Sequence, residues 1–172
     1  FVPYWITQLV TRKIDIIENR WKLFLALVIW LLFIPNAFYI ITDLIHFTRV
    51  RSAPKWFDLL LIFSFAWNGI MFGIVSLRKV EVITAVIRGK HFSAMLVFAV
   101  MWLNSLGIYI GRYLRFNSWD VITDPFSLVA EISDLLLNPF QNSVAWGMTF
   151  CYAVFMTLLY LSVKKLGESF TA

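Results

Sequence analysis

Four long apolar stretches dominate the chain and restrict what it can fold into. They cover about residues 23–44, 57–77, 92–113 and 144–163. A helix that crosses the hydrocarbon core of a bilayer needs about 20 mostly apolar residues, and each stretch is long enough. Because lipid offers no hydrogen-bond partners, a spanning backbone must satisfy its own polar groups, as a helix does. The sequence therefore predicts an all-α, polytopic transmembrane bundle of at least four spans.

The composition excludes an ordinary soluble domain. Hydrophobic residues make up 60% of the chain and charged residues 15%, against about 45–50% and about 25% in soluble domains. No internal repeat or low-complexity linker divides the sequence, so we expect residues 1–172 to form a single membrane domain. Cys151 is the one cysteine and lies between Phe150 and Tyr152, where we expect a small buried residue.

The N-terminal segment has the pattern of a membrane interface. In residues 11–22, Ile14, Ile17 and Trp21 fall on one helical face and charged residues on another, which predicts a short interfacial amphipathic helix. Residues 1–10 are too short to span a bilayer, and we expect them to be the end of a truncated helix.

A second amphipathic helix is predicted in the last long loop. Asp124 followed by Pro125 is typical of an N-cap with proline at the first helical position. Asn138 followed by Pro139 predicts the end of that helix.

The basic residues predict how the bundle is oriented. Loops alternate sides, so residues 11–22, 78–91 and the C-terminal tail share side A, while residues 46–57 and 112–140 share side B. Side A carries ten Lys and Arg residues and side B carries five. Cytoplasmic loops are enriched in these residues, so we expect side A and the C-terminus to be cytoplasmic.

Polar residues form a stripe where the first span approaches side B. Asn36, Tyr39, Asp43 and His46 stand at i, i+3, i+7 and i+10 and share one helical face. Pro35 removes a backbone donor just before them, which predicts a kink. Ionisable groups inside a membrane are costly, so this stripe should face protein or water.

The third span carries a similar stripe toward the same side. Asn104, Arg112 and Arg115 fall on one face. Polar residues follow directly where the third span ends: Asn117, Trp119 and Asp120. The second span adds the amide of Asn68 near mid-membrane. Since both stripes end at side B, we expect Asp43 to approach Arg112 or Arg115 within direct or one-water hydrogen-bond reach.

This constellation predicts an extracytoplasmic-facing site with a division of roles. Asp43 orients the imidazole of His46, and we expect this pair to be catalytic in acid–base chemistry. Arg112 and Arg115 present planar donor forks that suit phosphate or carboxylate. The remaining polar residues complete the substrate site: Asn36, Tyr39, Asn68, Asn117, Trp119 and Asp120. The predicted function is an enzyme or binding protein for an anionic, lipid-like molecule.

Other interpretations stay open. The asparagines are also typical of hydrogen bonds between helices, and the arginines of snorkelling anchors. A metal site that adds Asp120 or Asp124 to Asp43 and His46 is less favoured, because two arginines oppose a cation. A small proton-coupled transporter is a second class, although the side-A halves of the spans are almost wholly apolar. A structural or assembly partner of another membrane protein is a third.

Three stretches carry a family resemblance: IPNAFYIITDLIHF, NGIMFGIVSLRKVE and GIYIGRYLRFNSWDVITDP. They resemble a family of small bacterial membrane proteins classed as domain of unknown function 1361. The resemblance implies a bacterial cell membrane and further hydrophobic sequence before residue 1. It implies no activity, substrate or cofactor. Membrane lipids are the expected partners, with a lipid-like ligand or a membrane protein in addition, and no nucleic acid is expected.

Overall fold

The computed structural model describes residues 1–42, 54–116 and 119–170, and these form helices joined by short turns, with no strand among them. In this described part, four helices are long and apolar enough to cross a membrane. They are Arg20–Thr42, Lys55–Arg88, Lys90–Leu114 and Ser143–Ser169. The predicted all-α fold with at least four candidate spans is confirmed.

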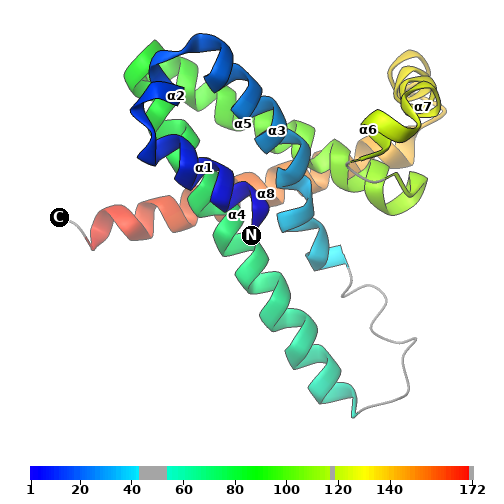
Figure 1. The fold of residues 1–172 in the computed structure, drawn as a ribbon. Helices are drawn as coiled ribbons and strands as arrows, with labels where there is room; N and C mark the ends of the chain where they lie inside the picture. The colour runs from blue at the N-terminus through cyan, green and yellow to red at the C-terminus, as the bar shows by residue number, and fades with distance from the viewer. Residues whose placement is uncertain (43–53, 117–118, 171–172) are drawn as a thin grey trace. The chain divides into compact units, whose positions relative to one another are not determined.

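The chain folds as two compact units, Phe1–Val97 and Phe98–Ala172 (Figure 1). The first holds α1 (Val2–Arg12), α2 (Ile14–Glu18), α3 (Arg20–Tyr39), α4 (Lys55–Arg88) and the beginning of α5 (Lys90–Tyr109). The second holds the rest of α5, the π-helix η2 (Ile110–Leu114), α6 (Asp120–Thr123), α7 (Pro125–Leu137) and α8 (Ser143–Ser169). The expectation of a single domain stays a prediction.

The N-terminal segment differs from the one interfacial helix expected over residues 11–22. The backbone is extended at Lys13 and again at Asn19, so the segment divides into the end of α1, the short α2 and the start of α3. The Asn19 side chain accepts hydrogen bonds from the backbone N–H groups of Trp21 (3.0 Å) and Lys22 (3.3 Å). These bonds satisfy donors of the first helical turn, which is why a new helix starts there.

A buried serine joins three helices of the first unit, α1, α3 and α4. The Ser76 hydroxyl on α4 accepts from Trp30 Nε1 of α3 (2.6 Å) and donates to the Pro3 carbonyl of α1 (2.9 Å). Thr7 Oγ1 of α1 lies 3.3 Å from the same hydroxyl. Figure 1 shows α1 beside α3 and α4. Hydrogen bonds of this kind hold neighbouring helices together in a membrane protein.

Two glycines let α3 and α4 approach closely. A Cβ at Gly69 would lie 2.6 Å from the backbone oxygen of Ala37, and one at Gly73 would lie 2.8 Å from the ring of Phe38. Gly-x-x-x-Gly spacing in an apolar helix is typical of such close packing. A larger residue at either position would push the two helices apart.

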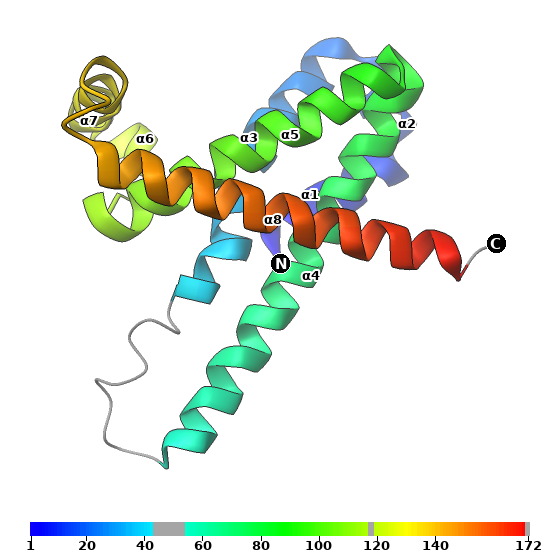
Figure 2. The ribbon, with the colours of Figure 1, turned by 180° about the vertical axis from the view of Figure 1, so that it is seen from behind.

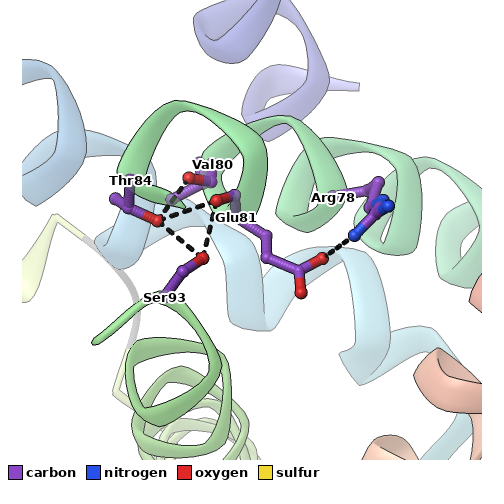
Figure 3. Close-up of polar contacts among 5 residues, drawn as sticks. All are labelled: Arg78, Val80, Glu81, Thr84 and Ser93. Atoms are coloured by element: carbon purple, nitrogen blue, oxygen red, sulfur yellow. Dashed lines mark hydrogen bonds and ion pairs between the residues drawn. The ribbon is translucent and has the colours of Figure 1, made fainter. Parts of the chain in front are cut away.

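The segment between the second and third spans is mostly helical, where a loop over residues 78–91 was expected. Helix α4 continues to Arg88, and Gly89 makes the turn into α5 with a φ of 92°, a conformation that glycine adopts readily. Buried hydroxyls close the hairpin: Ser93 donates to the Glu81 carbonyl (2.6 Å) and Thr84 lies 3.0 Å from Ser93 (Figure 3). Glu81 also pairs with Arg78 one turn earlier. The charged residues therefore extend the helix beyond the apolar span.

The second unit contains the amphipathic helix predicted after residue 124. The Asp124 side chain accepts from the Ser127 backbone N–H (3.3 Å), Pro125 is the first residue of α7, and Asn138 is its C-cap. Figure 2 shows α6 and α7 at the beginning of α8. These helix limits are confirmed.

Cys151 on α8 is exposed, so the expectation of a buried cysteine was wrong.

Candidate functional site

The first polar stripe is described only in part. Asn36 lies on α3 and is exposed, and Tyr39 ends that helix half-buried. Helix α3 continues through Pro35, and a 3₁₀ turn over residues 40–42 follows it. Asp43 and His46 lie outside the described residues, so the proposed catalytic pair stays a prediction.

The amide of the second span hydrogen-bonds its own helix. Asn68 is exposed on α4, and its Nδ2 donates to the Ser64 carbonyl one turn earlier at 2.8 Å. The Ser64 hydroxyl in turn donates to the Leu60 carbonyl at 2.7 Å. The structure therefore places Asn68 on an exposed helix face, and its role in a substrate site stays a prediction.

The stripe of the third span does not continue as one face. Asn104 and Ile108 are buried, whereas Arg112 is half-buried and Arg115 is exposed. Residues 110–114 form a π-helix, in which the Arg115 N–H donates to the Ile110 carbonyl five residues earlier. This extra residue in the turn shifts the following side chains around the helix axis. The prediction that Arg115 shares a face with Asn104 was therefore wrong.

Arg112 lies among tyrosines. Tyr109 and Tyr113 precede and follow Arg112 in the sequence, and their rings stack with centroids 5.2 Å apart. The charges of Arg112 and Tyr113 both act on the phenol of Tyr152 in α8. Aromatic residues therefore precede and follow Arg112 in the chain, and aromatic faces attract planar cations.

Arg115 has an unusual backbone conformation. Its φ is 61° and its ψ is 27°, in the left-handed region that non-glycine residues seldom adopt. This residue ends the π-helix and turns the chain toward α6. Two departures from α-helical geometry therefore follow one another where the span ends.

The residues after the turn complete the described part of the site. Trp119 is exposed, and Asp120 is half-buried at the first position of α6. The Asp120 carboxylate accepts a hydrogen bond from Thr123 Oγ1 at 2.9 Å. Asn117 lies outside the described residues. The second unit thus places Arg112, Arg115, Trp119 and Asp120 along one short stretch of chain.

Sequence reasoning gave no role to a carboxylate that the structure finds at the α7–α8 corner. Asp134 accepts from Asn138 Nδ2 (2.7 Å) and from Asn142 Nδ2 (3.1 Å). These hydrogen bonds stabilise the ionised carboxylate and lower the pKa of Asp134 below its ordinary value. Trp146 Nε1 on α8 donates to the Leu135 carbonyl at 3.0 Å. The i, i+4, i+8 spacing of the three polar residues was the signal for this cluster.

Two buried polar side chains of the second unit lack a hydrogen-bond partner among the described residues. They are the amide of Asn104 and the hydroxyl of Thr149. Asn104 was expected in the substrate stripe, but nothing in the sequence distinguished Thr149. No group of three His, Cys, Asp or Glu side chains in the described ranges is arranged to hold a metal ion.

Comparison with known proteins places most of the chain in one family. A family described as "Protein of unknown function (DUF1361)" matches residues 1–160. The chain belongs to this family. The resemblance carried by the three sequence stretches is therefore confirmed, and with the four candidate spans it indicates a membrane protein. No curated protein and no solved structure matches the chain.

Proposed function

We propose that this membrane protein binds a lipid-like molecule with a phosphate or carboxylate group, and that Arg112 and Arg115 hold the anionic group. The observation that carries the proposal is the π-helical turn Ile110–Leu114, which contains Arg112 and ends at Arg115. π-Helical turns are rare and occur frequently at functional sites.

The backbone geometry argues against a simple snorkelling anchor. A left-handed conformation costs a non-glycine residue roughly 1–2 kcal/mol, and an anchor gains nothing from it. Such strain persists where the surrounding structure requires a particular side-chain direction. Arg115 has this conformation three residues after Arg112, so two guanidinium groups leave the chain within one turn.

The chemistry of the neighbouring side chains supports an amphiphilic ligand. Guanidinium forks form paired hydrogen bonds with phosphate or carboxylate oxygens. Tyr113 and Trp119 are exposed beside the arginines and offer apolar surface with a polar edge, as is common at membrane interfaces. A ligand with an anionic head and an apolar tail fits this combination better than a fully polar solute.

In addition to the anion site, we propose the acid–base role that the sequence predicts for Asp43 and His46. An imidazole that exchanges a proton near neutral pH can act as general base, and a carboxylate three residues earlier can orient it. We propose that the end of η2 lies on the extracytoplasmic side of a bacterial cytoplasmic membrane and that the C-terminus lies inside, because Lys and Arg residues favour side A over side B two to one.

The test is lipid retention by purified variants. Arg112→Gln and Arg115→Gln are compared with Lys165→Gln, which removes one positive charge from an exposed position near the end of α8. Each protein is purified in detergent, mixed with phosphatidic acid, a fatty acid or phosphatidylcholine, and analysed by native mass spectrometry. Loss of one charge-assisted contact should weaken binding of the two anionic lipids about ten- to hundredfold.

The controls separate a site from general charge. Lys165→Gln should bind like the wild type, and phosphatidylcholine binding should not change in any variant. Equal retention of the anionic lipids by all four proteins would overturn the proposal. His46→Ala tests the catalytic part separately, because it should leave anionic lipid binding unchanged.

A further inference from the structure

A second cationic group lies in the first unit, where α1 meets α4. The Lys79 ammonium on α4 hydrogen-bonds the side-chain oxygen of Gln8 on α1. It also lies over the ring of Tyr4, 4.3 Å from the centroid. Lys79 is half-buried, so two residues of a neighbouring helix fix a side chain that would otherwise move freely.

A second positive charge stands beside this lysine. Arg12, the last residue of α1, stands one helical turn after Gln8, so its side chain lies on the same face of α1 that Lys79 contacts. Neither residue forms an ion pair with a carboxylate in the part of the chain that the structure describes. Two described acids of this region are bonded to other bases, Asp15 to Lys22 at 2.6 Å and Glu81 to Arg78.

Like charges repel each other, and an anion bound between them offsets that repulsion. The fold nevertheless places Arg12 and Lys79 on the same side of the α1–α4 contact, from separate helices. Lys79 has three N–H donors and gives one to Gln8, which leaves two without a described partner.

The contact between α1 and α4 is apolar farther from Arg12 and Lys79. Phe72 of α4 packs against Phe1 at a centroid distance of 4.7 Å and against Tyr4 at 5.3 Å. Trp5 and Leu9 of α1 are 67% and 49% exposed and lie one turn apart. A cationic end beside an exposed apolar strip matches a molecule with an anionic head and acyl chains.

We propose that Arg12 and Lys79 bind the phosphate group of an anionic phospholipid, with its chains along the exposed face of α1. The site stands on α1 and α4 alone and is independent of Arg112 and Arg115. Its ligand chemistry is a phosphate oxyanion, which a lipid headgroup or free phosphate supplies. The apolar strip favours the lipid, and anionic lipids are abundant in the cytoplasmic leaflet that side A is expected to face.

The test compares three single-charge variants of the full chain: Arg12→Gln, Lys79→Gln and the control Lys13→Gln. Lys13 is the exposed neighbour of Arg12, so its variant has the same net charge as the other two. Each protein is reconstituted in phosphatidylcholine nanodiscs with and without phosphatidylglycerol, and bound lipid is counted by native mass spectrometry. A parallel titration with inorganic phosphate in detergent tests the free ion.

Arg12→Gln and Lys79→Gln should each lower the affinity for phosphatidylglycerol about tenfold or more, whereas Lys13→Gln should match the wild type. Competition by inorganic phosphate would identify the free ion as a ligand of the same pair, and its absence would identify the lipid. Equal losses in all three variants, or none in Arg12→Gln, would overturn the proposal. If Lys79→Gln fails to fold, Arg12→Gln decides, because Arg12 is exposed.

Discussion

Replacing Gly69 by alanine tests the close approach of α3 and α4. The added Cβ would lie 2.6 Å from the Ala37 carbonyl oxygen and 3.2 Å from Ile40 Cγ2, where ordinary contact begins at 3.4 Å. The obstacle is backbone rather than a flexible side chain, so the helices must separate by roughly 0.8 Å at this level. We therefore expect Gly69→Ala to destabilise the first unit.

The magnitude follows from two opposing effects. Extra atoms in a well-packed interface cost about 1–3 kcal/mol. Alanine favours the helical state over glycine by about 0.5–1 kcal/mol. The net destabilisation is therefore on the order of 1–2 kcal/mol, and the second effect reduces it without reversing its sign.

Gly147 provides the matched control on α8. A Cβ there meets nothing within 4 Å, so Gly147→Ala keeps the helix gain and lacks the clash. We would follow unfolding in mixed micelles by titration with a denaturing detergent, using circular dichroism. Gly69→Ala should unfold at lower denaturant than the wild type, and Gly147→Ala at the same or higher denaturant. A shift of both variants in the same direction would refute the packing argument.

Two further predictions follow from single contacts, and a third follows from the distribution of basic residues. Trp30→Phe removes the donor to Ser76 and should destabilise by about 0.5–1.5 kcal/mol in the same titration, while the exposed Trp5→Phe should have no effect. Because its pKa is lowered on folding, Asp134 stabilises the α7–α8 corner fully above its unfolded pKa and loses that effect as pH falls through the lowered value. The melting temperature of the wild type should therefore drop relative to Asp134→Asn below about pH 4, and parallel curves would contradict this. In a Cys151→Ser background, an impermeant thiol reagent should label Ser127→Cys and spare Lys90→Cys in intact cells; the reverse pattern would invert the orientation.

Local chemistry made part of the fold predictable. The limits of α7 depend on Asp124, Pro125 and Asn138, whose capping roles require no distant residue. The four spans follow from length and apolarity alone. Both features were read correctly because neighbouring residues determine them.

Features set by contacts between helices were missed. The charged residues from Arg78 to Arg88 were expected in a loop, yet they continue α4, where buried hydroxyls and Gly89 form the hairpin. The Gly69–Gly73 spacing was visible in the sequence, but its role depends on which helix lies opposite. The Ser76 contacts join residues up to 73 positions apart, and no periodicity reveals them.

The candidate site was predicted in composition and mispredicted in geometry. A stripe drawn at 3.6 residues per turn assumes a uniform α-helix. The π-helix at Ile110–Leu114 breaks that assumption and separates Arg115 from the face of Asn104. Residue types therefore indicated the chemistry, whereas the direction of each side chain depended on one irregular turn.

The proposed site on α1 and α4 contains a cation that the fold restrains. A freely snorkelling Lys or Arg loses about 1.5–2 kcal/mol of side-chain entropy when a ligand fixes it. Lys79 is already held by Gln8 and Tyr4. A restrained cation binds an anion with less entropic loss, because part of the ordering occurs on folding. Restraint by neighbouring residues therefore distinguishes Lys79 from exposed basic residues such as Lys13, and the comparison of Lys79→Gln with Lys13→Gln measures this property.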